Sequence, residues 1–212
     1  GEAIKFSDKS LQNDSEFLLK AIKEDSYSLK YINKKFIENK EFILKAISID
    51  GTSMRFVSAH LKQDKDFIIQ AVKKNGRALE FVDEKIKKDK SFLLDIFKLN
   101  GFILEYADES LKKDKDIVYQ AVRQNSRSLK FADKIFWSDR KFLFKLVKEN
   151  GFAIRFASEN IKKDKKIILE AVKYDGCVLQ YAHENLKNNE KIVLNAVKSN
   201  IKALNYANHD LI

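Results

Sequence analysis

The sequence predicts an all-α fold, an α-solenoid of about eight 25-residue helical hairpins, with about 17 short helices in an elongated or arc-shaped array. Three observations indicate this fold. An aromatic residue recurs every 25 residues without insertion or deletion, two amphipathic segments fill each period, and an Asp or Asn residue stands before each segment. The aromatic residues are Phe6, Tyr31, Phe56, Phe81, Tyr106, Phe131, Phe156, Tyr181 and Tyr206.

The first segment of each repeat is predicted to be an amphipathic helix. In the repeat that begins at Asp64, a broad apolar stripe leaves Asp66, Gln70 and Lys73 outside. Asp64 can accept hydrogen bonds from the free backbone N–H groups of the first turn, which makes it an N-cap. The stripe consists of Phe67, Ile68, Ile69, Ala71 and Val72. The N-cap position holds Asp14, Asn39, Asp64, Asp89, Asp114, Asp139, Asp164 and Asn189.

The connection between the two segments carries an Asp or Asn residue, which a glycine follows in most repeats. In the same repeat this pair is Asn75-Gly76, and it predicts a left-handed turn that ends the first helix. Turn and cap chemistry explains the whole column without a ligand. The glycines are Gly51, Gly76, Gly101, Gly151 and Gly176.

The second segment is predicted to be another short amphipathic helix. Its apolar face contains Leu79, Val82 and Ile86. Helices of about ten residues are marginal in isolation, so successive hairpins must stabilise one another by stacking. We expect the recurring aromatic residue to pack between hairpins, although aromatics along a groove can also stack on unpaired bases.

The unbroken register leaves no place for a linker and predicts a single α-helical repeat domain over residues 1–212. The chain begins with Gly1 rather than Met and starts and stops partway through a repeat, which indicates a segment of a longer protein. Ile4 at one end and Leu211-Ile212 at the other are expected to expose apolar surface. End-to-end self-association is therefore a further expectation.

The motif resembles a known α-helical repeat family. The pattern is visible in Ser128-Leu129-Lys130-Phe131-Ala132 and in residues 164–172, which read DKKIILEAV. It is similar to a family catalogued only as a domain of unknown function, in which two hairpins count as one domain. A weaker 50-residue rhythm, in which Arg77 and Arg127 alternate with Phe102 and Phe152, agrees with that unit. The resemblance implies an α-solenoid and supplies no catalytic residues.

No catalytic, metal or cofactor constellation is visible, so we expect a protein that is not an enzyme. His60, His183 and His209 occupy three different repeat positions and show neither zinc-ligand nor dyad spacing. The single Cys177 excludes an intramolecular disulfide and fits a reducing compartment, either a cytoplasm or a host cytoplasm into which the chain is delivered. The sequence does not name the compartment.

Charge carries the remaining functional signal. The net charge of +10 favours contact with a polyanion or an acidic partner, although lysines that merely solvate helix faces give the same composition. On the first helices, one acidic position changes to lysine after Asp116. The C-terminal third therefore contains a candidate partner-binding set: Trp137, Arg140, Lys141, Lys145, Lys148, Lys166, Lys173, Lys191 and Lys198.

Trp137 stands among positions that hold lysine in neighbouring repeats, so it is either an exposed binding residue or a ring packed beside Phe136. Acidic residues with little local compensation gather near the middle of the chain and form an alternative site. They are Glu80, Asp83, Glu84, Glu105, Asp108 and Glu109.

The first functional hypothesis is a non-enzymatic scaffold that binds another macromolecule, a protein, through its charged surface. The second is nucleic-acid binding through the C-terminal basic set and a ridge of basic residues in the return loops between repeats. The third is a structural spacer in a larger protein. No apolar run is long enough to cross a bilayer, so we expect no membrane insertion. The return-loop residues are Lys62, Lys65, Lys87, Lys88, Lys90, Lys112, Lys113, Lys115, Arg140, Lys162, Lys163, Lys165 and Lys187.

Overall fold

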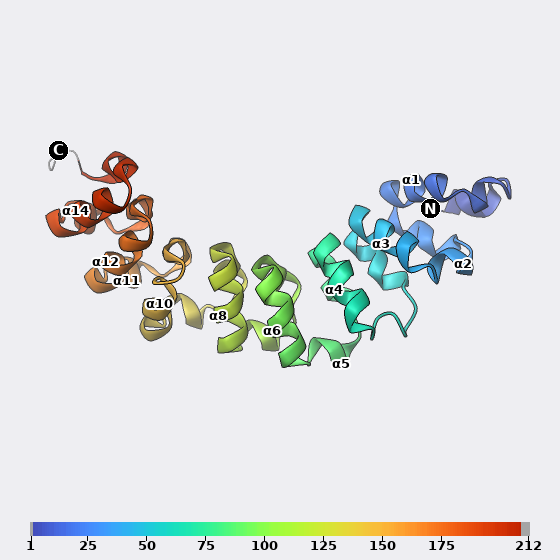
Figure 1. Cartoon of the computed structure of the whole chain (residues 1–212), viewed down its shortest axis with the longest axis horizontal. Coiled ribbons are helices and arrows are strands. Elements are labelled where there is room, and N and C mark those ends of the chain that lie inside the picture. The colour runs from blue at the N-terminus through green and yellow to red at the C-terminus, as the bar shows by residue number, and fades with distance from the viewer. Residues whose placement is uncertain (1, 209–212) are drawn as a thin grey trace. The chain divides into compact units, whose positions relative to one another are not determined.

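The computed structural model describes residues 2–208, with side chains from Ile4 onward, and the predicted all-α repeat fold is confirmed (Figure 1). These residues form fourteen α-helices and ten 3-10 helices, and they contain no strand. The chain divides into two compact units, Gly1–Asp108 (unit 1) and Glu109–Ile212 (unit 2). The expectation of one continuous domain stays a prediction.

The first helix of each repeat forms as predicted. In the type repeat, the side chain of Asp64 accepts a hydrogen bond from the backbone N–H of Phe67 at 3.1 Å, as an N-cap should. Phe67, Ile68 and Val72 are buried, whereas Ile69 at the edge of the stripe is only half-buried. The first helices are α1 (Ser15–Glu24), α3 (Lys40–Ile49), α4 (Lys65–Lys74), α6 (Lys90–Leu99), α8 (Lys115–Gln124), α10 (Arg140–Leu146), α12 (Lys165–Tyr174) and α14 (Glu190–Ser199).

The second segment is a 3-10 helix, followed in most repeats by a short α-helix, rather than one continuous helix. Val82 is extended, with φ of −71° and ψ of 168°, and Asp83 then accepts a hydrogen bond from the backbone N–H of Lys85 at 2.9 Å. Asp83 therefore caps a new helix in the middle of the segment. The short α-helices are α2 (Lys34–Ile37), α5 (Glu84–Lys87), α7 (Glu109–Lys112), α9 (Ile135–Ser138), α11 (Glu159–Lys162) and α13 (Glu184–Lys187).

The 3-10 helices occupy equivalent positions in successive repeats, except for η2, which lies between η1 and the first α-helix. In the type repeat, Ala78 and Leu79 turn inward from the 3-10 helix and are buried. The 3-10 helices are η1 (Glu2–Phe6), η2 (Leu11–Asn13), η3 (Ser26–Tyr31), η4 (Gly51–Phe56), η5 (Gly76–Phe81), η6 (Gly101–Tyr106), η7 (Ser126–Phe131), η8 (Gly151–Phe156), η9 (Gly176–Tyr181) and η10 (Ile201–Tyr206).

The predicted left-handed turn between the segments is wrong. Neither glycines nor other residues adopt a positive φ anywhere in the described range. Asn75 is extended, with φ of −152° and ψ of 112°, and its side chain accepts a hydrogen bond from the backbone N–H of Arg77 at 3.1 Å. One Asp or Asn residue thus ends the first helix and also caps the 3-10 helix.

The glycine after this residue serves a close approach between repeats instead. A Cβ atom added to Gly151 would lie 2.6 Å from the backbone oxygen of Ala171, and one added to Gly176 would lie 2.0 Å from that of Ala196. Both distances are shorter than the closest approach of two non-bonded atoms. At these two positions the preceding repeat can pack against the next first helix only because it lacks a side chain.

Within each unit the repeats stack in sequence order (Figure 1). In unit 1, α1, α3, α4 and α6 pack side by side, and so do η3, η4, η5 and η6. In unit 2 the corresponding rows are α8, α10, α12, α14 and η7, η8, η9, η10. The core lies between the two rows, where each first helix packs against 3-10 helices.

The recurring aromatic residues lie at the edges of this core. They are half-buried, apart from Phe6, which is 87% exposed. Side chains of the preceding repeat cover their rings: the Arg55 guanidinium is 4.8 Å from the ring centre of Phe81, and that of Arg155 is 5.8 Å from Tyr181. The inter-repeat packing that the sequence predicts therefore includes cation–π contacts.

The prediction of apolar exposure at Ile4 is wrong, because its side chain is only 4% exposed. The Gln12 side-chain amide donates a hydrogen bond to the Ile4 carbonyl at 3.0 Å and closes the first turn over it. Leu211-Ile212, the other predicted apolar end, lies outside the described residues.

Candidate functional site

Six of the predicted lysines lie on one face of three first helices in unit 2, and a seventh, Lys148, lies in the turn directly after α10 ends at Leu146. The helices α10, α12 and α14 pack in that order. The face consists of the second, sixth and ninth residues counted from the first residue of each helix, which share one side of an α-helix. In the α10 repeat the ninth residue lies in the turn after the helix. We call this surface the basic face, and all its lysines are exposed: Lys141, Lys145, Lys148, Lys166, Lys173, Lys191 and Lys198.

Most charges of the basic face are not neutralised by a carboxylate. Among residues 4–208, neither a hydrogen bond nor an ion pair holds the ammonium groups of Lys141, Lys166, Lys191 and Lys198. Lys145 lies 4.3 Å from the ring centre of Tyr119, which leaves its charge uncompensated. Within the face, only Lys173 has a carboxylate partner, Glu170, at 2.7 Å.

Arg140, which was predicted with this set, has a different role. Its guanidinium pairs at 2.5 Å with Asp164, the N-cap of the following repeat. The same contact joins Lys40 to Asp64 at 2.7 Å and Lys65 to Asp89 at 2.6 Å. In these repeats, the residue that begins the first helix forms an ion pair with the N-cap of the following repeat. This ion pair explains why a positive charge stands at the start of a helix. Arg140 contributes to stacking within unit 2.

These inter-repeat ion pairs predict acid sensitivity. The hydrogen bonds from Lys65 and from the backbone N–H of Phe92 lower the pKa of Asp89 to about 2. A carboxyl whose folded pKa lies below its unfolded value of about 4 contributes stability above that value, and the contribution is lost between about pH 4 and pH 2. Asp89→Asn keeps the cap acceptor but removes the charge, as Asn39 does naturally.

We expect Asp89→Asn to be less stable than the native chain at pH 6, and we expect this difference to shrink as the pH falls from about 4 to about 2. Urea midpoints followed by circular dichroism at each pH measure it. Asp66→Asn, on the exposed face of α4, removes an equal charge without touching a cap. An equal change in pH dependence for both variants would contradict the role of the pair.

Trp137 is half-buried, and its indole is engaged inside unit 2. Its Nε1 donates a hydrogen bond to the carbonyl oxygen of Leu129 at 2.9 Å. In the next repeat the corresponding residue, Lys162, pairs instead with Glu159 at 2.9 Å. In the Trp137 repeat, Lys134 replaces that glutamate, and its ammonium is 6.0 Å from the indole ring. The structure therefore favours local packing for Trp137 over a free binding residue.

The predicted acidic site does not form an uncompensated patch. Glu80 pairs with Arg77 at 3.3 Å, and Asp83 serves as a cap. Glu84 pairs with Lys87, and Glu109 with Lys112, both at 2.8 Å. The lysine three residues later on the same short helix supplies this compensation. Glu105 is half-buried and Asp108 is exposed, both in unit 1, whereas Glu109 belongs to unit 2.

The return-loop ridge is compensated in the same way. Lys87 and Lys112 pair on their own short helices, and so does Lys187 with Glu184 at 2.7 Å. Lys115 pairs with Asp139 at 2.9 Å across repeats within unit 2. Much of the predicted ridge thus consists of ion pairs without net charge.

A row of apolar side chains inside the basic face was missed by sequence reasoning. Phe144, Leu169 and Leu194 each stand three residues after the lysine at the second position of their helix. Phe144 and Leu169 are half-buried, and Leu194 is 50% exposed. The sequence pattern assigns this position to the buried apolar stripe of the first helix, so its exposure was not predicted. The signal was available, because the position lies at the edge of the stripe, beside the lysines.

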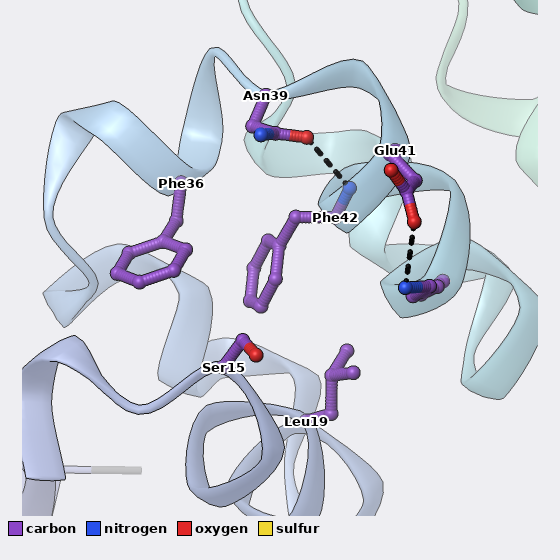
Figure 2. A pocket seen from close by; sticks show the side chains of 7 residues that line it. Ser15, Leu19, Phe36, Asn39, Glu41 and Phe42 are labelled. Carbon is purple, nitrogen blue, oxygen red and sulfur yellow. Dashed lines mark hydrogen bonds and ion pairs between the residues drawn. The ribbon is translucent and has the colours of Figure 1, made fainter.

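The corresponding surface of unit 1 has a different charge. A pocket of about 190 Å³ lies between α1, α2 and α3. Leu19, Phe36 and Phe42 line it (Figure 2). Glu41 pairs with Lys45 at 2.8 Å beside it. These two residues correspond to Lys141 and Lys145 of the basic face. The acid-to-lysine change therefore converts a neutral pair into two positive charges.

The remaining reactive side chains do not come together. Residues 2–208 contain no group of three or more His, Cys, Asp and Glu residues that could hold a metal ion. His183 caps α13 through Nδ1, which accepts a hydrogen bond from the Asn185 N–H at 3.3 Å, and His60 is exposed. Burial and the neighbouring Asp175 raise the pKa of the Cys177 thiol. His209 lies outside the described residues.

Comparison with protein families gives five tandem matches along the chain. The family described as a domain of unknown function, DUF4116, matches residues 1–37, 39–87, 89–137, 139–179 and 164–212. The chain belongs to this family. The DUF4116 matches at 39–87 and 89–137 each contain two repeats, as the sequence predicted. Comparisons with curated proteins and with solved structures found no match. None of the helices in residues 2–208 is long and apolar enough to span a bilayer.

Proposed function

We propose that this chain is a non-enzymatic repeat module that binds an acidic surface of another protein through the basic face. One observation carries the proposal: the face presents seven exposed lysines, and only one of them is paired with a carboxylate. On α6, by contrast, Lys98 pairs with Asp95 at 2.8 Å. Uncompensated charge on packed helices attracts and orients a partner of opposite charge.

Several features support a protein rather than a nucleic acid as the partner. The basic face contains Glu170 and the apolar row, and Tyr174 beside it is 49% exposed. A phosphate backbone would gain nothing from these side chains, whereas protein interfaces combine apolar and charged contacts. Several of the return-loop lysines, which would extend a phosphate track, are paired with carboxylates within the chain.

Charge reversal tests this function. We expect wild-type protein to bind a fluorescent poly-glutamate peptide, and Lys141→Glu/Lys166→Glu/Lys191→Glu to weaken that binding about tenfold, since each substitution replaces attraction by repulsion. Fluorescence anisotropy at low salt measures it. The matched control is Lys20→Glu/Lys23→Glu/Lys73→Glu, at exposed first-helix positions of unit 1, and its affinity should stay within about twofold.

Two outcomes would overturn the proposal. Equal losses for the two triple variants would show that net charge alone attracts the peptide. Tighter binding of a single-stranded oligonucleotide than of poly-glutamate, with a steep loss of affinity as salt rises, would support the nucleic-acid hypothesis instead.

A further inference from the structure

The apolar row and the lysines of the basic face follow one pattern on three successive helices. Each repeat places a lysine near the start of its first helix, an apolar residue three positions later and a second lysine four positions after that. The second lysine lies in the helix on α12 and α14, and in the turn after Leu146 in the α10 repeat. Residues with this spacing share one side of an α-helix. Because α10, α12 and α14 pack side by side, the pattern extends across unit 2 as an apolar row flanked by two lysine rows. The apolar row is Phe144, Leu169, Leu194; the lysine rows are Lys141, Lys166, Lys191 and Lys148, Lys173, Lys198.

The apolar row is accessible between the lysines. Leu194 is 50% exposed, and its two counterparts are half-buried. The ammonium of Lys148 lies 4.7 Å from the ring centre of Phe144, so its stem follows the edge of the row while its charge stays exposed. The face therefore offers apolar surface in its middle and positive charge along both edges.

The dimensions of this surface match those of an α-helix. On α12 and α14 the two lysines are seven positions apart, which at the usual helical rise places the lysine rows about 10 Å apart. An α-helix with its side chains is about 10 to 12 Å wide. Neighbouring helices pack about 8 to 10 Å apart, so the apolar row extends about 18 Å and spans about 12 residues of a partner helix.

We propose that the basic face binds one amphipathic α-helix of a partner protein, which lies across α10, α12 and α14. Its apolar stripe contacts Phe144, Leu169 and Leu194, and acidic side chains on both sides of the stripe contact the two lysine rows. An extended strand alternates its side chains between two opposite faces and has no stripe with two flanks. This inference rests on the proposed function and specifies the chemistry of the partner.

Peptides of matched composition test the proposal. The first places leucines in a helical stripe with glutamates on both flanks, and the second contains the same residues in an order that scatters the leucines. A third keeps the stripe but carries lysines in place of the glutamates. We expect the first peptide to bind at least about tenfold more tightly than the second, and the third not to bind. The circular dichroism of the first peptide should show that it becomes helical when it binds.

Variants of the chain locate the binding site. Leu194→Ser should lower the affinity for the first peptide about tenfold and leave the affinity for poly-glutamate unchanged, because the substitution removes only apolar contact. Leu94→Ser, at the equivalent position of α6 in unit 1, is the matched control and should bind as wild type. Circular dichroism of each variant confirms folding.

The two proposals fail in different ways. The scattered peptide could bind as tightly as the striped one, with charge reversal of either lysine row weakening the binding of both peptides equally. In that case the face binds acidic protein without recognising a helix, and the inference is wrong. If neither peptide binds, and charge reversal of the lysine rows changes nothing, the proposed function itself is wrong.

Discussion

Gly176→Ala is expected to destabilise unit 2 by about 3 kcal/mol, near the upper end of the usual cost of overpacking. The added Cβ would lie 2.0 Å from the backbone oxygen of Ala196 and 2.8 Å from its carbonyl carbon. Both are backbone atoms of α14, so no side-chain rotation can relieve the contact. The repeat would have to move away from α14, which would weaken the packing of η9 against that helix. Urea unfolding followed by circular dichroism measures the loss.

Gly76→Ala is the matched control for this substitution. There the added Cβ would first meet a side-chain atom, Cγ1 of Ile103, at 3.1 Å, and that side chain can adjust. Ser26 and Ser126 occupy the same repeat position. Alanine also restricts the unfolded chain more than glycine does, which offsets part of any strain. We expect a change of at most about 1 kcal/mol for Gly76→Ala, and equal losses for both variants would refute the close-approach explanation.

The fold could largely be predicted because its strongest signals are local and repeated. The N-cap Asp64 and the buried Phe67 and Leu79 follow from spacing within one repeat, and the structure confirms all three. The turn could not be predicted correctly, because an Asn-Gly pair fits two structures. Asn75 uses its side chain as a cap, and the glycines of this column permit close approach rather than a left-handed conformation.

The candidate site was predicted in part for a similar reason. Repeat positions revealed the lysines of the basic face, since each position can be compared along the chain. They did not reveal that Arg140 is paired, because its partner Asp164 lies in the next repeat. The pairing of Glu84 with Lys87 was readable from their spacing on a helix. The accessibility of Leu169 depends on how closely neighbouring helices approach one another. The sequence pattern of apolar and polar residues does not determine that distance.

Phe97→Ala is expected to destabilise unit 1 by about 4 kcal/mol, as for other buried phenylalanines. Phe97 is fully buried in α6, at a repeat position that holds the smaller residues Ile47, Val72 and Val122 elsewhere. Truncation removes the ring and leaves a cavity, because α4 and the 3-10 helix η6 pack against α6 and are constrained by their own contacts.

Hydrogen exchange should show where this stability is lost. In a stack of repeats each repeat contacts its neighbours, so amides of α4 and α6 should lose more protection in Phe97→Ala than those of α1. Leu99→Ala on the same helix is the control, because Leu99 is 47% exposed and its truncation should cost less than about 1 kcal/mol. Equal losses for the two variants would mean that the described core of α6 does not hold unit 1 together. A loss that spread evenly over α1, α4 and α6 would mean that unit 1 unfolds as one cooperative body rather than repeat by repeat.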